Sequence, residues 1–134
     1  MCTTLAAWHL KKVALVEKER GLIINVSSRL ASHGFPGVAA YSASKRAIEA
    51  MLLPVARELG HHKIRLLNIA PGLMKTAMSD VMPEEERQRV AALNMRGQLG
   101  EAHNLAQLVE AIVRNGYLNA TTVHLDDGER VPYV

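Results

Sequence analysis

Two short apolar runs, "LIINV" at residues 22–26 and "IRLLNIA" at residues 64–70, constrain the fold of this chain more than any other feature. Neither run alternates apolar with polar residues, which is typical of strands that are buried on both faces of a parallel sheet. An amphipathic segment at residues 40–59 separates them. Because parallel neighbouring strands need a crossover connection, usually a helix, the sequence predicts a strand, helix, strand unit of an α/β fold.

The rest of the chain continues this alternation of helices and strands. The further predicted elements are a helix over residues 2–19, a short helix over 83–93, a helix around 105–112 and a strand over 121–125. Pro54 predicts a kink within the segment 40–59, and Gly21 and Gly60 are predicted to end the helices that precede them. The order of elements predicts about three parallel strands with helices on both faces of the sheet.

Charge and cysteine content favour some classes of protein over others. Lys and Arg number 16 against 13 Asp and Glu in the 134 residues, and no basic block suggests a nucleic acid or a membrane as partner. Cys2 is the only cysteine, so we expect no internal disulfide and a cytoplasmic or other reducing intracellular location. The first twenty residues carry charges too early and too often for a signal peptide or a spanning helix.

Ligands of parallel sheets bind beyond the carboxyl ends of the strands, so the loops that follow the predicted strands are the places to search. Ser27 and Ser28 begin the first of these loops, and Pro71 and Gly72 begin the second. The third begins with "DDG" at residues 126–128. We expect the three loops to meet at one edge of the sheet.

A tyrosine and a lysine in "YSASK" stand four positions apart, which places Tyr41 and Lys45 on one face of the predicted helix. A free phenol is too weak an acid to exchange protons readily at neutral pH. A lysine ammonium about 4 Å from a phenolate in a partly desolvated site stabilises it by roughly 4 kcal/mol. The pair therefore favours general acid or base chemistry, with a core tyrosine and a solvated surface lysine as the alternative reading.

Three segments together, "INVSS", "YSASK" and "NIAPGLMKT", resemble motifs of the short-chain dehydrogenase/reductase family. The resemblance covers most of the chain and weakens after Ala77. It implies a partial Rossmann-like fold, a doubly wound parallel sheet, in a single partial domain over residues 1–134. It also implies NAD or NADP as cofactor and a small-molecule alcohol or carbonyl compound as substrate.

The resemblance also implies a role for each matched residue. Tyr41 would exchange a proton with the substrate oxygen, Ser28 would hydrogen-bond the same oxygen, and Lys45 would in addition hold the nicotinamide ribose hydroxyls. The residues that would border the nicotinamide are Pro71, Gly72, Leu73 and Thr76. A glycine at position 72 permits a close backbone approach.

The segment that follows, residues 78–99, is predicted to be a substrate lid, because it matches the lid of the family in position. Four methionines, Met74, Met78, Met82 and Met95, could form an adaptable apolar wall there, with ordinary packing as the alternative. The lid sequence does not identify the substrate.

Some features of the family are missing from this sequence. No G-x-x-x-G-x-G or G-x-G-x-x-G segment is present to bind a pyrophosphate. The resemblance begins in the helix before residues 22–26, and the position of the family's relay asparagine falls at or before Met1. We therefore expect a partial gene product, a splice form or a truncated gene model whose Met1 is an internal methionine of a longer protein. In the given chain, the strand at residues 22–26 is expected to have one edge without a partner.

Two hypotheses for the function follow. The first is an NAD(P)-dependent oxidoreductase that interconverts a secondary alcohol and a ketone through Ser28, Tyr41 and Lys45. The second is a noncatalytic truncated family member that associates with full-length subunits. In the family the helices that match residues 2–19 and 40–59 commonly form a subunit interface, so the resemblance implies a homo-oligomer through them.

No metal site is expected. The histidines form no metal-ligand spacing with Cys2 or the acidic residues. The "DDG" at residues 126–128 lacks the other ligand positions of a calcium loop and is interpreted as the turn after the last strand.

Overall fold

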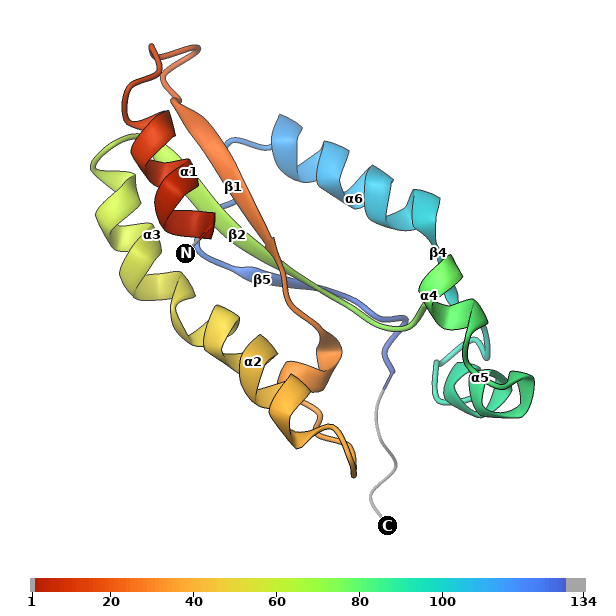
Figure 1. The fold of residues 1–134 in the computed structure, drawn as a ribbon. Helices are drawn as coiled ribbons and strands as arrows, with labels where there is room; N and C mark the ends of the chain where they lie inside the picture. Colours follow the sequence, from red (N-terminus) through yellow and green to blue (C-terminus); the bar gives the residue numbers. More distant parts are fainter. Residues whose placement is uncertain (1, 130–134) are drawn as a thin grey trace.

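A parallel sheet of three strands forms the centre of the chain, as predicted. The computed structural model describes residues 2–129, and the strands are β1 (Gly21–Val26), β2 (Ile64–Pro71) and β5 (Thr122–Leu125), in the order β1-β2-β5 (Figure 1). Each predicted strand agrees with the observed one to within a residue at either end. The non-alternating apolar runs thus gave the strand positions correctly, because β2 is buried along nearly its whole length.

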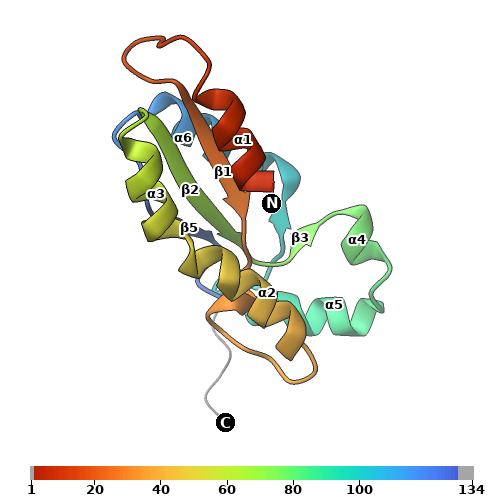
Figure 2. The ribbon, with the colours of Figure 1, turned by 60° about the vertical axis from the view of Figure 1, so that its left-hand side comes forward.

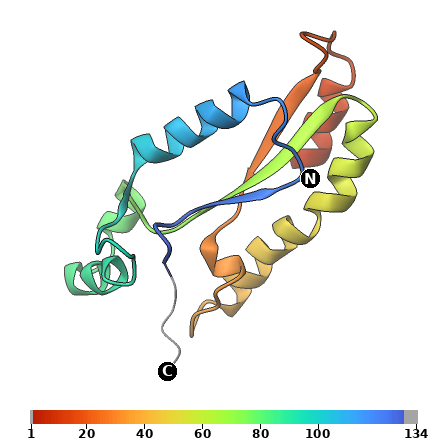
Figure 3. The same cartoon turned by 180° about the vertical axis from the view of Figure 1, so that it is seen from behind.

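Helices cover both faces of this sheet. The helices α1 (Cys2–Leu10), α2 (Ala39–Ala50) and α3 (Leu52–Gly60) lie on one side, and α6 (Ala102–Arg114) lies on the other (Figures 1 and 3). This arrangement is the doubly wound pattern that alternating strands and helices predict. None of the helices within residues 2–129 is long and apolar enough to span a membrane.

The central strand β2 divides the core into two halves. Leu66 packs with residues of α1 and α3, whereas Leu67 and Ile69 pack with Ile112 of α6. All four side chains are completely buried. Because successive side chains of a strand point to opposite faces, a run without polar residues is what a strand covered on both sides requires.

The first helix is shorter than predicted, because it ends at Leu10 and not near residue 19. The next apolar positions, Val13 and Val16, are 45% and 70% exposed, so this stretch has no core contacts to support a helix. The prediction that Gly21 ends the helix is also wrong. Gly21 is the first residue of β1, and a Cβ there would lie 2.7 Å from the Leu10 side chain.

The predicted helix over residues 40–59 is present in two pieces, α2 and α3, which join at Met51. Pro54 lies in the first turn of α3, where its missing N–H does not break the helix. The predicted kink is therefore confirmed, and Gly60 is the last residue of α3, as expected.

A smaller unit projects from the carboxyl end of the sheet (Figure 2). It contains the helices α4 (Ala77–Asp80) and α5 (Glu84–Ala91) and a pair of two-residue parallel strands, β3 (Met74–Lys75) and β4 (Gly100–Glu101). The helix predicted over residues 83–93 is α5, with three glutamates in its first turn. This unit includes the predicted lid over residues 78–99.

Within the described residues, β1 pairs with β2 alone. One edge of this strand therefore carries no ladder hydrogen bonds, as the sequence predicts. An apolar strand with such an edge is able to pair with another strand.

Candidate active site

Three loops meet at the carboxyl edge of the sheet. Val26 of β1 is in register with Ile69 of β2, and Pro71 of β2 is in register with Leu125 of β5. The loops that follow these strands therefore start next to one another, as the parallel topology predicts. Gly72 extends the contact, because its N–H donates to the Leu125 carbonyl at 2.9 Å.

The two serines after β1 are held in different ways. The Ser27 hydroxyl donates its hydrogen to Glu49 Oε1 at 2.9 Å, so this hydrogen is engaged in a bond within the fold. Ser28 begins the short 3-10 helix η1 (Arg29–Ala31), and its Oγ accepts a hydrogen bond from the Leu30 N–H at 3.2 Å. No described residue accepts the Ser28 hydroxyl hydrogen, so Ser28 is the serine that is able to donate to a substrate oxygen.

Tyr41 and Lys45 lie on the same face of α2, as their spacing predicts. Lys45 Nζ is 5.6 Å from the centre of the Tyr41 ring. The same ammonium donates to the Val26 carbonyl at 3.0 Å, which ties it to the end of β1. An ammonium has three donors, so two remain after this bond.

An apolar cavity of about 480 Å³ joins Ser28 and Tyr41 to the loop after β2. Gly72 and Leu73 also line it. Its apolar walls include Leu30, Phe35, Val38, Met78, Val90 and Leu93. Lys45, Pro71 and Thr76 are not among its lining residues. The structure therefore brings four of the seven predicted site residues into one cavity.

Gly72 allows a close approach, but the neighbour is another part of the same chain. A Cβ at this position would lie 3.0 Å from Glu129 Oε2 and 3.2 Å from Asp126 Cα. The glycine therefore lets the turn after β5 pack against the loop after β2. Thr76 precedes α4, and its N–H donates to Ser79 Oγ at 3.0 Å.

Three of the four methionines of the proposed wall line the apolar cavity, namely Met74, Met78 and Met82. Met95 does not. Its side chain lies against Gly128, at 2.8 Å from the place of a Cβ there, and is 73% exposed. The expectation for Met95 is wrong because the chain turns at residues 94–97 and carries this residue toward the turn after β5.

The sequence did not indicate a buried ion pair beside Ser28. Arg29 Nε contacts Glu129 Oε2, and the two side chains are 7% and 0% exposed. Burial raises the pKa of the Glu129 carboxyl, and the Arg29 guanidinium opposes that shift. The partners stand 100 positions apart, so no local pattern could have shown this pair.

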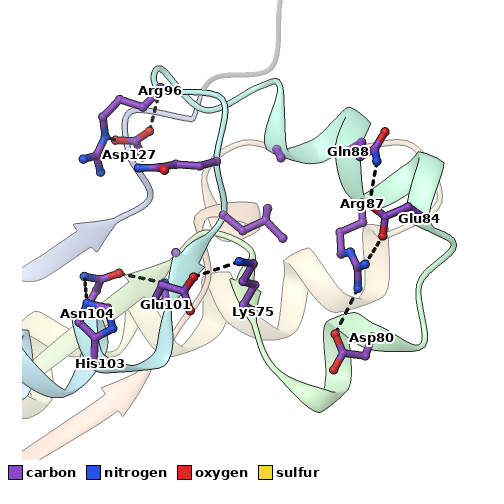
Figure 4. A pocket seen from close by; sticks show the side chains of 14 residues that line it. Lys75, Asp80, Glu84, Arg87, Gln88, Arg96, Glu101, His103, Asn104 and Asp127 are labelled. Carbon is purple, nitrogen blue, oxygen red and sulfur yellow. Dashed lines mark hydrogen bonds and ion pairs between the residues drawn. The ribbon is translucent and has the colours of Figure 1, made fainter.

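A second, polar cavity of about 750 Å³ lies between the lid segment and α6 (Figure 4). Its charged side chains bind one another. Lys75 pairs with Glu101 at 3.1 Å, and Arg96 pairs with Asp127 at 2.6 Å. Hydrogen bonds from the Arg96 N–H and guanidinium lower the pKa of Asp127. The polar cavity contains none of the predicted site residues, so the apolar cavity is the better candidate for an active site.

No cluster of three or more metal-ligating side chains occurs within residues 2–129. Residues 126–128 form a turn directly after β5, in agreement with their interpretation as the terminal turn. Gly128 has a φ of +68°, a conformation that favours glycine.

Comparison with known proteins identifies relatives of one kind. The model of the family described as short chain dehydrogenase matches residues 2–87. Mouse 3-hydroxyacyl-CoA dehydrogenase type-2 is 41% identical over 114 residues, which are 84% of this chain and 44% of that protein. The 3-oxoacyl-[acyl-carrier-protein] reductase FabG of Haemophilus influenzae is 31% identical over 128 residues, 92% of this chain and 53% of that protein.

Comparison of the fold with solved structures identifies a relative with the same name as the mouse protein. The crystal structure of 3-hydroxyacyl-CoA dehydrogenase type-2 from Mycobacterium avium matches with a TM-score of 0.90 and 30% identity. The match covers 97% of this chain and 51% of that one. The chain thus spans about half the length of the curated relatives and of this structure.

Proposed function

Because this chain belongs to the short chain dehydrogenase family, we propose that it carries the proton-transfer site of an NAD(P)-dependent oxidoreductase that interconverts a secondary alcohol and a ketone. One observation carries the proposal. Ser28, whose hydroxyl hydrogen no described residue accepts, and Tyr41 line the same apolar cavity. The function belongs to the whole protein, of which this chain corresponds to about half in its relatives.

The proposed reaction assigns one role to each of the three residues. In the direction of reduction, the Tyr41 hydroxyl donates its proton to the carbonyl oxygen, and in oxidation the phenolate takes the proton from the alcohol. The Ser28 hydroxyl donates a hydrogen bond to the same oxygen and orients it. The Lys45 ammonium, tied to Val26, stabilises the phenolate through its positive charge.

The described residues fit the nicotinamide end of NAD or NADP. Lys45 retains two donors, which suit the adjacent hydroxyls of a ribose, and Gly72 and Leu73 border the cavity beside Tyr41. The bound nicotinamide would supply or accept the hydride. The pyrophosphate end is not matched in this way, because the sequence contains no Gly-rich loop.

Two observations support one class of substrate, namely the names of the relatives and the lining of the apolar cavity. The mouse and Haemophilus relatives are a 3-hydroxyacyl-CoA dehydrogenase and a 3-oxoacyl reductase. The cavity beside Ser28 and Tyr41 is lined mostly by apolar side chains, as an acyl chain requires. We propose a 3-hydroxyacyl or 3-oxoacyl compound as substrate, with the lid segment over the acyl chain.

A noncatalytic family member that associates with full-length subunits is the second candidate. The edge of β1 supports it, because within the described residues this strand pairs with β2 alone. The predicted oligomer interface would then involve α1 together with α2 and α3, the elements that correspond to residues 2–19 and 40–59. Trp8 of α1 and Leu53 of α3 are 54% and 52% exposed, as an interface of this kind needs.

Thermal unfolding with and without NADH or NADPH separates the two candidates. A nucleotide at about one hundred times its dissociation constant stabilises a fold that binds it by roughly 2.7 kcal/mol. The oxidoreductase proposal predicts a higher unfolding temperature with one of the nucleotides, and a smaller rise in a Lys45→Met variant. An unfolding temperature that neither nucleotide changes favours the noncatalytic candidate.

A further inference from the structure

The buried ion pair between Arg29 and Glu129 joins two of the loops that surround the apolar cavity. Arg29 directly follows Ser28 and lines the cavity with it. Glu129 follows the turn after β5, where its N–H donates to the Asp126 carbonyl at 2.9 Å. A contact between these two side chains therefore connects the serine loop to the end of the last strand.

The Glu129 carboxylate also reaches the third loop. Its Oε2 lies 3.0 Å from the place where a Cβ on Gly72 would stand, so it packs directly on the backbone of this glycine. The Gly72 N–H in turn donates to the Leu125 carbonyl. One carboxylate thus contacts both Arg29, next to Ser28, and Gly72, next to Leu73.

The opposite side of the serine loop is already fixed by other contacts. Ser27 donates to Glu49 of α2 at 2.9 Å and, more weakly, to the Lys45 carbonyl at 3.3 Å. These two bonds hold Ser27, which precedes Ser28 and η1, against α2. On the side of β5, the contact of Arg29 with Glu129 is the only hydrogen bond or ion pair that η1 makes among the described residues.

We propose that Arg29 and Glu129 are positioning residues, which hold the Ser28 hydroxyl at a fixed place relative to the Gly72 loop across the apolar cavity. This inference rests on the proposed function of Ser28. Arg29 suits the task because a buried guanidinium is always charged and its planar group fixes the direction of its contact with a carboxylate. A buried pair of this kind often adds little net stability, because the cost of removing the charges from water offsets their attraction.

A double variant removes the pair without leaving a buried charge. Arg29→Met/Glu129→Met replaces both side chains by apolar ones of similar length, which such sites often tolerate. The control is Arg65→Met/Glu19→Met, because Arg65 is also buried and pairs with Glu19 at 2.9 Å, at the opposite end of β2. Arg65 also donates to the carbonyls of Ile112 and Leu118, so this control removes more contacts than the Arg29→Met/Glu129→Met variant does. The Arg29→Lys variant keeps the positive charge but loses the planar group, so it separates these two contributions.

Backbone amide signals in ¹H–¹⁵N NMR spectra of the full chain test the proposal without any ligand. We expect the Arg29→Met/Glu129→Met variant to unfold cooperatively but to shift or broaden the signals of Ser28, Leu30 and Gly72. The Arg29→Lys variant should shift them by a smaller amount, because it keeps the positive charge and loses only the planar contact. The control at Arg65 and Glu19 should leave them unchanged.

Turnover of a 3-hydroxyacyl thioester adds a second readout. Displacing a reacting group by about 1 Å can cost roughly 100-fold in rate, so kcat should fall by about that factor while KM changes little. Wild-type amide signals for Ser28 and Gly72 in the Arg29→Met/Glu129→Met variant would overturn the positioning role, as would equal shifts in the control. Neither result would affect the role of Tyr41, which a Tyr41→Phe variant tests separately.

Discussion

Lys45 Nζ donates a hydrogen bond to the carbonyl oxygen of Val26 at 3.0 Å. This bond connects the middle of α2 to the last residue of β1, directly before the two serines. The ammonium therefore has a fixed place between the serine loop and Tyr41.

Replacing Lys45 by methionine should weaken both the fold and the reaction. The lost hydrogen bond to Val26 is expected to lower the free energy of unfolding by about 1 kcal/mol, and the lost charge should reduce turnover strongly. Urea unfolding and a turnover assay measure the two effects. The control is Arg57→Met at an exposed position of α3, which we expect to change the free energy of unfolding by no more than about 0.5 kcal/mol. Unchanged turnover in Lys45→Met would contradict its role.

The two neighbouring serines should respond differently to alanine. Ser27→Ala removes the donor to Glu49 and is expected to lower the free energy of unfolding by about 1 kcal/mol while turnover continues. Ser28→Ala is expected to lower kcat by roughly 100-fold or more, because it removes a donor to the reacting oxygen. If the larger loss of kcat occurs with Ser27→Ala, the assignment of the two serines is reversed.

Gly72 and Gly60 form a matched pair for a test of close packing. A Cβ on Gly72 would meet the Asp126 backbone at 3.2 Å, and this backbone cannot move easily, so Gly72→Ala should destabilise the fold by about 1–3 kcal/mol. A Cβ on Gly60 meets no atom within 4 Å, and Gly60→Ala in α3 should stabilise by about 0.5–1 kcal/mol. Thermal unfolding of both variants checks the signs, and a neutral Gly72→Ala would refute the contact.

Glu129 should make the stability depend on pH. Burial raises the pKa of its carboxyl above the ordinary 4.5, against the opposing effect of Arg29 and with a further rise from Asp126. The folded chain therefore holds the proton more tightly than the unfolded chain does. Its contribution to stability is greatest below the ordinary value and is lost as the pH rises through the raised value.

Urea unfolding at a series of pH values measures this effect for the wild type and for Glu129→Gln, which cannot titrate. The difference in the free energy of unfolding between the two proteins should change in favour of Glu129→Gln as the pH rises. A difference that moves in the other direction would mean that Arg29 outweighs burial.

The first two parallel strands could be predicted because neither run alternates apolar with polar residues, although β2 is buried along nearly its whole length and β1 lies at the edge of the sheet. "LIINV" and "IRLLNIA" are apolar without alternation, and only a sheet covered on both faces accommodates such runs. The placement of Ser28 and Gly72 around one cavity followed from the rule that parallel strands end at the same edge. Tyr41 lies on α2, and the sequence joined it to these residues only through the family resemblance.

Other features depend on contacts that the sequence does not encode locally. Val13 and Val16 have the spacing of a helix, yet they lie away from the core, so the predicted helix stops at Leu10. Arg29 and Glu129 meet only because β5 lies beside β2 in the sheet. The lid role of residues 78–99 and the oligomer interface stay predictions.

The most direct test of the proton-transfer site is the nucleotide-dependent oxidation of a 3-hydroxyacyl thioester by the wild type, Tyr41→Phe and Tyr117→Phe. Tyr117 is 99% exposed and lines no part of the apolar cavity, so its substitution is the matched control. We predict turnover by the wild type and Tyr117→Phe, and its loss in Tyr41→Phe with an unchanged unfolding temperature. Equal turnover in all three proteins would contradict the role of Tyr41, and absence of turnover in the wild type would favour the noncatalytic candidate.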